Sequence, residues 1–296
     1  MKILITGSTG LLGTALVKRL ARSNELVGLS RHPTAAPTRH EVCDLADAEA
    51  VNRLMRSVKP DAVIHAQAMS DVDRCELQPQ QAELMNARTV EHVCRAAELT
   101  GALVIALSTD YVFDGAKDSP YGETDPPRPI SVYGRTKLAG EQVALRYARG
   151  VVVRPSTLFG PGRMNFCDAI VERCRRGEPI DAFTDQATSP TYTEDLAEAL
   201  DRLATALVTR DWTSATPRLY HAANAGGCTR VQFASRIVER LGGSPALVRP
   251  IRMQDQHRPA PRPPYSVLTS HHLTAIIGTQ LRPWDEALNA YLTSQH

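Results

Sequence analysis

A glycine-rich segment near the start of the chain constrains its fold most. It reads Gly7-Ser-Thr-Gly10-Leu-Leu-Gly13 and lies between a strand-forming run, Lys2–Thr6, and a run with helical periodicity, Leu11–Leu20. Glycines let the chain turn sharply after a strand and let the next helix pack close to the sheet. The helix N-terminus then offers N–H groups and a positive dipole to phosphate oxygens. The segment predicts a dinucleotide cradle, with Gly-x-x-Gly-x-x-Gly spacing in place of the Gly-x-Gly-x-x-Gly of most dehydrogenases.

Strand and helix patterns alternate through the first half of the chain. The expected strands after the first are Leu26–Leu29, Asp61–His65, Leu103–Leu107 and Val151–Val153, and the expected helices are Val51–Val58, Gln81–Leu99 and one from Tyr133 to Ala148. This alternation predicts an α/β fold, a Rossmann-type doubly wound parallel sheet with helices on both faces. Ligands bind such sheets beyond the carboxyl ends of the strands. The loops after Thr6, Leu29, His65, Leu107 and Val153 are therefore expected to line the site.

Beyond Pro155 the pattern loosens. Helices are expected at Met164–Arg175, Asp195–Leu207, Val231–Leu241 and Pro283–Leu292, and 259–264 reads as a stiff proline-rich loop. We expect a dinucleotide-binding domain over 1–155, with returning elements at about 185–224. A smaller C-terminal substrate-binding lobe is expected from 156–184 and 225–296.

Composition narrows the function classes. The 296 residues carry a formal net charge of +2, and no basic block favours nucleic acid as a partner. No apolar run reaches the length of a membrane span. Six scattered cysteines form no C-x-x-C pair, so neither a zinc site nor a disulfide framework is expected, and no metal site is predicted. The chain runs from Met1-Lys2 directly into a strand without a signal peptide, which predicts a cytoplasmic protein.

The end of the second strand bears on the choice of cofactor. A carboxylate there would bind the ribose 2′-hydroxyl of NAD, whereas this chain has Ser30-Arg31-His32. Because a guanidinium pairs with a 2′-phosphate, NADPH is favoured, with NADH as the alternative if Arg31 is only a solvated loop cation. Asp44-Leu45 follows the next short segment. Asp44 is expected either near the adenine or as a helix cap.

Tyr133-Gly-Arg-Thr-Lys137 predicts a proton donor with a helper. Residues four apart on a helix share a face, so Lys137 lies beside Tyr133. A nearby ammonium favours phenolate and lowers a tyrosine pKa from its ordinary value near 10. The alternative is an ordinary surface pair on an amphipathic helix. Thr109, at the end of a buried strand, is the expected donor to a substrate carbonyl oxygen, with Ser108 as the competing candidate.

At this point the chain resembles a known family. It is similar to the extended short-chain dehydrogenase/reductases, most closely the dTDP-4-dehydrorhamnose reductases and related nucleotide-sugar 4-ketoreductases, over nearly its whole length. The segments that carry the resemblance are Leu107-Ser-Thr-Asp-Tyr-Val-Phe-Asp-Gly115, Tyr121-Gly-Glu-Thr-Asp125, Val132-Tyr-Gly-Arg-Thr-Lys-Leu-Ala-Gly-Glu141, Asp185-Gln186 with Ser189-Pro190-Thr191, and Arg262-Pro-Pro-Tyr-Ser266.

The resemblance implies a set of site residues. The catalytic residues are Thr109, Tyr133 and Lys137, and Asn86 and Arg154 fall where the family lines its cofactor pocket or sheet. The residues expected at the cofactor are Gly7, Thr9, Gly10, Leu11, Leu12, Gly13, Ser30, Arg31, Asp44, Leu45, Ala66, Gln67, Ala68, Tyr133 and Lys137. Those expected at the substrate are Asp110, Tyr111, Thr157, Asn165 and Arg262. Arg249, Arg252, Arg258 and Arg262 are candidates to clamp a substrate diphosphate.

The implied activity is NADPH-dependent reduction of the 4-keto group of a nucleotide-activated deoxysugar, with a dTDP-linked substrate. Thr157 stands where the reductases usually place an aromatic that packs on the sugar, so sugar identity is open. Tyr111 replaces the acidic residue that 4,6-dehydratases use, which argues against elimination. A nucleotide-sugar 4-epimerase and a non-catalytic regulatory subunit, like the β subunit of methionine adenosyltransferase, are the alternatives. Some relatives dimerise, so a homodimer is possible here.

Overall fold

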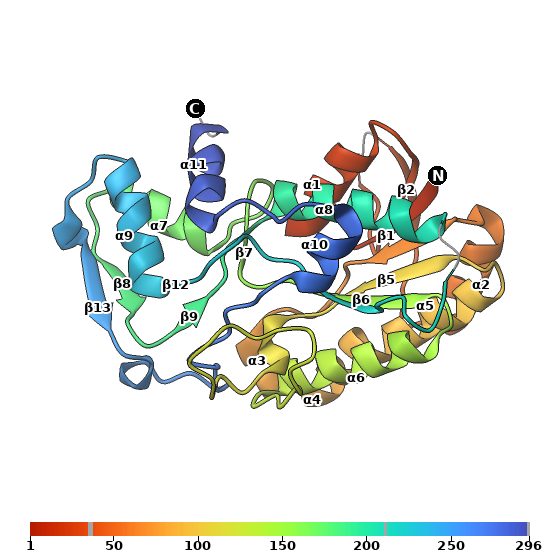
Figure 1. Ribbon diagram of the computed structural model, residues 1–296, viewed down its shortest axis with the longest axis horizontal. Coiled ribbons are helices and arrows are strands. Elements are labelled where there is room, and N and C mark those ends of the chain that lie inside the picture. The colour runs from red at the N-terminus through yellow and green to blue at the C-terminus, as the bar shows by residue number, and fades with distance from the viewer. Residues whose placement is uncertain (35–37, 210–211, 295–296) are drawn as a thin grey trace.

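A seven-stranded parallel sheet forms the centre of the protein (Figure 1). The computed structural model describes residues 1–34, 38–209 and 212–294. The sheet order is β11-β6-β5-β4-β1-β2-β3. Its strands are β1 (Lys2–Thr6), β2 (Glu25–Ser30), β3 (Arg39–Val42), β4 (Ala62–His65), β5 (Leu103–Leu107), β6 (Gly150–Arg154) and β11 (Leu219–His221). Every residue of β4, β5 and β6 is buried, as continuous apolar strands covered on both faces require.

Two hydrophobic layers cover the faces of this sheet. On one face lie α1 (Leu11–Leu20), α8 (Thr193–Val208) and α10 (His271–Ile277), and on the other lie α2 (Ala48–Val58), α5 (Thr89–Glu98) and α6 (Val132–Arg146) (Figure 1). Each helix buries its apolar stripe. On α1, for example, Leu12, Leu16 and Leu20 pack into the core. The sheet is therefore a rigid platform whose carboxyl edge is left for function.

A third hydrophobic core lies in a smaller group of elements beside the sheet, at the left of Figure 1. This group of elements consists of β7 (Leu158–Phe159), α7 (Phe166–Arg175), β8 (Ile180–Phe183), β9 (Ala187–Thr188), β10 (Thr191–Tyr192), β12 (Cys228–Thr229), α9 (Arg230–Arg240), β13 (Val248–Ile251) and α11 (Trp284–Ser294). Aromatic rings fill this core, and Phe159 contacts Tyr192, Phe233 and Tyr291. Short two-stranded pairs hold the group together.

The predicted fold class, a doubly wound parallel sheet with a smaller C-terminal lobe, is confirmed. The division into domains stays a prediction. Between 185 and 224, α8 and β11 return to the sheet, whereas α10, in the segment assigned to the lobe, packs against α8 and β11. The edge strand β3 was not predicted from the sequence. An edge strand is paired on one side only and needs no continuous run of apolar residues.

The predicted helix over Gln81–Leu99 is interrupted. The chain forms α3 (Val72–Leu77) and α4 (Pro79–Glu83), then a π-helical turn, η1 (Leu84–Arg88), before α5. The side chain of Asn86 in this turn accepts from Met69 N–H (2.8 Å) and donates to Thr136 Oγ1 (3.1 Å). These tertiary bonds compensate the widened turn. Short 3₁₀ turns complete the fold: η2 (Asp110–Val112), η3 (Pro245–Leu247) and η4 (Met253–Asp255).

Candidate active site

A cavity of about 670 Å³ runs along the carboxyl edge of the sheet. The loops after β1, β2, β4, β5 and β6 all contribute to it, as predicted for a doubly wound sheet. Every residue expected at the cofactor lines this cavity: Gly7, Thr9, Gly10, Leu11, Leu12, Gly13, Ser30, Arg31, Asp44, Leu45, Ala66, Gln67, Ala68, Tyr133 and Lys137. The structure thus brings these residues together, and their contact with a cofactor stays a prediction.

The glycine loop has the geometry of a phosphate cradle. Gly7 has a φ of +67°, a backbone conformation that other residues rarely adopt. A Cβ on Gly13 would lie 2.1 Å from Gly7 O, so only glycine lets α1 approach the loop so closely. Gly10 is the N-cap of α1 and offers no side-chain acceptor to the first-turn N–H groups. Gln67 Oε1, which is buried, has no hydrogen-bond partner among the described residues. These features fit a dinucleotide.

The edge of the cavity near β2 holds the residues that bear on the nucleotide. Arg31 is exposed and lines the cavity, together with Arg74 and Arg163, which the sequence did not indicate. Asp44 lines the cavity and accepts a hydrogen bond from Ala46 N–H (3.0 Å), two residues before α2 begins, so the helix-cap role considered for it is wrong. The N-cap of α2 is Asp47. Of the cavity-lining residues that follow β2 and β3, Arg31 is a cation that can pair with a 2′-phosphate, and Asp44 is an acid.

Helix α6 carries Tyr133 and Lys137 into the same cavity. Ser131 caps the helix by accepting from Gly134 N–H (3.1 Å). A Cβ on Gly134 would lie 2.2 Å from Tyr111 O, so the first turn packs tightly against the segment after β5. Lys137 is buried and its Nζ donates to Leu107 O (2.6 Å), at the end of β5. The two side chains thus lie on one helix face, as their spacing predicted.

Burial dominates the acid–base properties of this pair. It raises the pKa of Tyr133 above the ordinary value, an effect that a hydrogen bond with Thr109 partly offsets. Burial lowers the pKa of Lys137 to about 8, while nearby Glu141 favours its charged form. The sequence had predicted a lowered Tyr133 pKa. In this structure desolvation outweighs any benefit from the lysine, and Tyr133 is a phenol at neutral pH.

Thr109 meets Tyr133 at the end of β5. Its side chain is buried, and its hydroxyl lies close enough to the Tyr133 phenol to oppose the rise in that phenol's pKa. Tyr111 N–H also donates to Thr109 Oγ1 (3.2 Å). The competing candidate, Ser108, donates instead to Glu141 Oε1 (2.5 Å), which is also bound by the buried guanidinium of Arg154. The geometry therefore favours Thr109 over Ser108 as the hydroxyl beside the phenol.

Asp110 lies beneath this point and does not face the cavity. It is 2 % exposed, and its carboxylate accepts hydrogen bonds from three protein hydroxyls. Asn165, likewise expected at the substrate, is the N-cap of α7. Its amide oxygen accepts from two first-turn N–H groups and its amide nitrogen donates to Gly160 O (2.8 Å). Asp110 is therefore a buried supporting residue, whereas Asn165 is half-buried and caps α7, and its contact with a substrate stays a prediction.

Tyr111 and Thr157 belong to a polar chain that continues into the smaller lobe. Gln186 Nε2 donates to Tyr111 Oη (3.2 Å), and Gln186 Oε1 accepts from Arg230 Nε (3.2 Å). Arg230 Nη2 donates to Thr157 Oγ1 (3.1 Å), and its guanidinium stacks on Phe166. The sequence missed Arg230. Thr229-x-x-Gln232 signals the start of α9, but nothing local connects its first residue with Tyr111.

The predicted arginine clamp divides into two groups. Arg249 pairs with Asp181 at the surface of β13 and β8, and Arg252 is an exposed residue before η4. Arg262 makes two 2.6 Å bonds to Asp73 on α3. Arg258 stacks on Phe183. Arg230, Arg258 and Arg262 lie close enough to affect one another's pKa values or that of Tyr111. In the described part of the chain, neither Arg230 nor Arg258 has an ion-pair partner.

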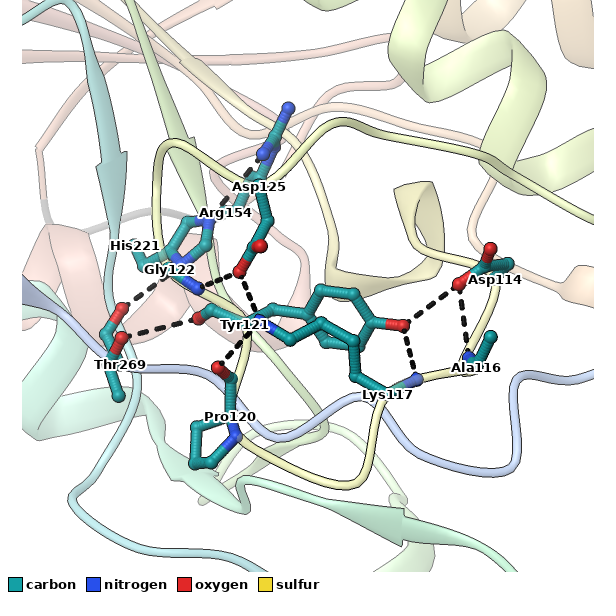
Figure 2. A network of polar contacts seen from close by, with 10 residues as sticks. All are labelled: Asp114, Ala116, Lys117, Pro120, Tyr121, Gly122, Asp125, Arg154, His221 and Thr269. Carbon is teal, nitrogen blue, oxygen red and sulfur yellow. Dashed lines mark hydrogen bonds and ion pairs between the residues drawn. The ribbon is translucent and has the colours of Figure 1, made fainter.

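The loop after β5 is braced by its own polar network (Figure 2). Tyr121 Oη donates to Asp114 Oδ1 (2.9 Å), and Lys117 Nζ pairs with Asp125 (2.7 Å). Behind the loop, His221 Nδ1 donates to Thr269 O (3.0 Å). This network leads from the loop to the late segment of the chain without entering the cavity.

Within residues 1–34, 38–209 and 212–294, no group of three potential metal ligands occurs, and no helix has the length and apolarity of a membrane span.

Comparisons with known proteins agree with this geometry. The family model described as "RmlD substrate binding domain" matches residues 1–296. A dTDP-4-dehydrorhamnose reductase of Mycolicibacterium smegmatis is 37% identical, with 97% of this chain and 84% of the relative covered. A probable dTDP-4,6-dihydroxy-2-methyloxan-3-one 4-ketoreductase of Streptomyces antibioticus is 35% identical, covering 97% and 93%. The structure of a Bacillus anthracis dTDP-4-dehydrorhamnose reductase in complex with NADP superposes with a TM-score of 0.88 at 28% identity, covering 99% of each chain. The resemblance read from the sequence is confirmed, and the chain belongs to the RmlD substrate-binding-domain family.

Proposed function

We propose that the protein is an oxidoreductase that uses NADPH to reduce the 4-keto group of a dTDP-linked deoxysugar, a reaction of deoxysugar biosynthesis. The observation that carries the proposal is the meeting of the Thr109 and Tyr133 hydroxyls beside a cavity lined by the glycine loop. A phenol that keeps its proton at neutral pH suits the reductive direction. Relatives named for this chemistry support it.

The residues of the chain divide the chemistry between them. When bound, NADPH supplies the hydride for the carbonyl carbon, and the loop from Gly7 to Gly13, Arg31 and Lys137 would hold it. Tyr133 donates its phenolic proton to the carbonyl oxygen as negative charge develops there. Thr109 lies beside the phenol; it donates its own proton to Asp110 Oδ1, so its oxygen turns a lone pair toward the phenol and holds it in place. Lys137, with a pKa of about 8, is mostly an ammonium at pH 7 and orients the ribose.

The substrate diphosphate would lie against Arg230 and Arg258. Together with Arg262 they bring three positive charges near Tyr111, and Asp73 neutralises one of them. The two remaining charges complement a diphosphate, which explains why these guanidiniums lie together without carboxylate partners in the described chain. Thr157, held by Arg230, then borders the sugar. Its small side chain leaves room where relatives carry an aromatic, so the sugar accepted here is expected to differ in shape.

Elimination is disfavoured by the same geometry. A 4,6-dehydratase needs an acid that reaches the leaving C6 hydroxyl, and both oxygens of Asp110 are occupied by protein hydroxyls. The next residue, Tyr111, is a phenol, a much weaker acid than the carboxylic acid that a dehydratase has there. Reduction therefore fits the site better than dehydration.

The test is NADPH oxidation against a panel of dTDP- and UDP-linked 4-keto-6-deoxysugars. Turnover with a dTDP-linked member is expected. Tyr133→Phe should lower kcat by about 10²- to 10⁴-fold, the contribution of a positioned general acid, with the Kd for NADPH nearly unchanged. Tyr147→Phe is the matched control, because that hydroxyl donates to Ala102 O (2.7 Å) inside the core. Near-normal kcat in Tyr133→Phe would rule out its role as proton donor.

Two other outcomes would point to the alternatives. Protein purified with tightly held NAD and interconverting 4-epimers without net NADPH oxidation would be an epimerase. Protein that turns over no keto sugar but binds a methionine adenosyltransferase tightly would be a regulatory subunit. A homodimer and a cytoplasmic location stay predictions, which sedimentation and cell fractionation can test.

A further inference from the structure

We infer that Asp110 is a positioning residue that acts on the Tyr133 phenol through Thr109. The inference rests on the proposed function, and it concerns a residue expected from the sequence to touch the sugar. Thr109 Oγ1 donates to Asp110 Oδ1 (3.0 Å), while Tyr111 N–H donates to Thr109 Oγ1 (3.2 Å). One bond on each side fixes the rotamer of Thr109. Its oxygen is then held against the Tyr133 phenol.

Asp110 is itself held by residues from distant parts of the chain. Ser156, after β6, and Ser266, in the late segment, both donate to Asp110 Oδ2, at 2.7 and 2.6 Å. Asp110 N–H donates to Pro155 O (3.0 Å). We call Thr109, Asp110, Ser156 and Ser266 the Asp110 cluster. All four side chains are buried.

The cluster joins three chain segments at one point. Ser189 N–H donates to Ser156 Oγ (3.3 Å), and Leu268 N–H donates to Ser189 Oγ (3.1 Å). Ser266 N–H donates to Ala187 O (2.8 Å). The carboxylate therefore has a fixed frame around it and cannot turn toward the cavity without breaking three hydroxyl bonds.

The inference predicts that the acceptor at Oδ1 matters and the negative charge does not. An asparagine amide oxygen can replace Oδ1, and its N–H₂ group can donate to Ser156 and Ser266 after their hydroxyls rotate. Asp110→Asn should therefore keep kcat within about fivefold. Asp110→Ala removes the acceptor, frees the Thr109 hydroxyl to turn away from the phenol and should lower kcat by about 10- to 100-fold, no more than the 10²- to 10⁴-fold typical of losing a positioned general acid outright. KM for the sugar nucleotide should change by less than about threefold.

A double-mutant cycle tests whether the effect passes through Thr109. Thr109→Val keeps the shape and removes the hydroxyl, so Asp110→Ala should cost no further kcat in that background. A direct sugar contact predicts instead a raised KM in both Asp110 variants. A role for the charge predicts that Asp110→Asn is as impaired as Asp110→Ala. Full additivity with Thr109→Val, or either of these two results, would overturn the inference.

The design includes a neighbouring acid as control. Asp114 Oδ1 accepts from Ala116 N–H (3.0 Å) and Tyr121 Oη (2.9 Å) and belongs to the loop network of Figure 2. Asp114→Ala should leave kcat within about twofold. If Asp110→Ala does not fold, Ser156→Ala/Ser266→Ala frees the carboxylate in its place and should lower kcat only when Thr109 is present.

Failure of the proposed function gives a different result. Wild-type protein would then oxidise no NADPH with any keto sugar in the panel. The inference is still tested, because the Thr109–Asp110 bond should appear as non-additivity in the free energy of unfolding of the same cycle. Additive unfolding energies would contradict the bond itself.

Discussion

The glycine edge of the cavity, which is the loop from Gly7 to Gly13, and the Asp110 cluster both follow the carboxyl ends of sheet strands, yet they are built in opposite ways. At the glycine edge, backbone atoms make the surface, and a missing side chain is what permits approach, as the 2.1 Å Cβ clash at Gly13 shows. In the Asp110 cluster, side chains make the structure and every oxygen of the carboxylate is bonded. The first region is shaped to admit a ligand, and the second to hold a catalytic hydroxyl.

The difference shows which kind of site can be predicted from a sequence. The glycine edge is a local motif, within seven residues between one strand and one helix. The cluster depends on partners far away in the chain: Asp110 and Ser266 are 156 residues apart, and Asp110 and Ser156 are 46 apart. A binding loop made of backbone atoms can therefore be recognised as a motif in the sequence. A cluster of side chains from distant segments can be recognised only in the folded structure.

The largest effect is expected from adding one methyl group to the glycine edge. Gly13→Ala places a Cβ against the carbonyl of Gly7 and must push α1 from the loop, so the Kd for NADPH should rise by about 100-fold or more. Gly122→Ala is the control, because its Cβ would meet nothing closer than 3.7 Å. Titration calorimetry measures both. Tight NADPH binding by Gly13→Ala would mean that the loop is not the cradle.

The next largest effect is expected at Arg230, beside the proposed substrate site. Arg230→Met keeps much of the side-chain volume on Phe166 but removes the charge, which should raise KM for the sugar nucleotide by about 10- to 100-fold, the value of a charge-assisted hydrogen bond. kcat and NADPH affinity should change little. Arg249→Met, which loses only a surface pair with Asp181, is the control. Equal KM values in the two variants would remove Arg230 from the substrate site.

The sequence predicted the sheet and most of the cavity because both follow from short-range patterns. Leu103–Leu107 is a strand with the bounds expected, and the loops after five strands meet at one edge. It could not predict that Asp110 is buried, since hydrogen-bond partners such as Ser266 lie far away in the chain. It also erred on the Tyr133 pKa, because pair spacing reveals the nearby lysine but not the desolvation that outweighs it.

A smaller effect is expected at Arg31, the exposed cation near the end of β2. If it pairs with the 2′-phosphate, Arg31→Ala should weaken NADPH binding by about tenfold and leave NADH binding unchanged. The ratio of the two Kd values is the measurement. Equal weakening of both cofactors, or of neither, would return Arg31 to the role of a solvated loop residue and shift attention to Arg74 and Arg163, which line the same cavity.

The smallest effect concerns His221 and the groups around it. His221 on β11 is fully buried, and burial, with the Arg154 guanidinium beside it, lowers its pKa to about 4 (Figure 2). Glu123 lies nearby and opposes this shift. The unfolded chain takes up a proton at this residue below pH 6.5, whereas the folded chain does not until about pH 4. The free energy of unfolding should therefore fall as the pH is lowered through this window.

At pH 6 the loss from one such histidine is below about 1 kcal/mol, and it grows by up to about 1.4 kcal/mol for each further pH unit. His65, also buried, has a pKa lowered to about 3 and adds to the slope. His221→Gln should flatten the dependence measured by urea unfolding between pH 7 and 5, whereas His257→Gln, at an exposed position, should not. An unchanged slope in His221→Gln would mean that the folded protein admits the proton at this residue, and that the hydrogen bonds around His221 do not keep it neutral.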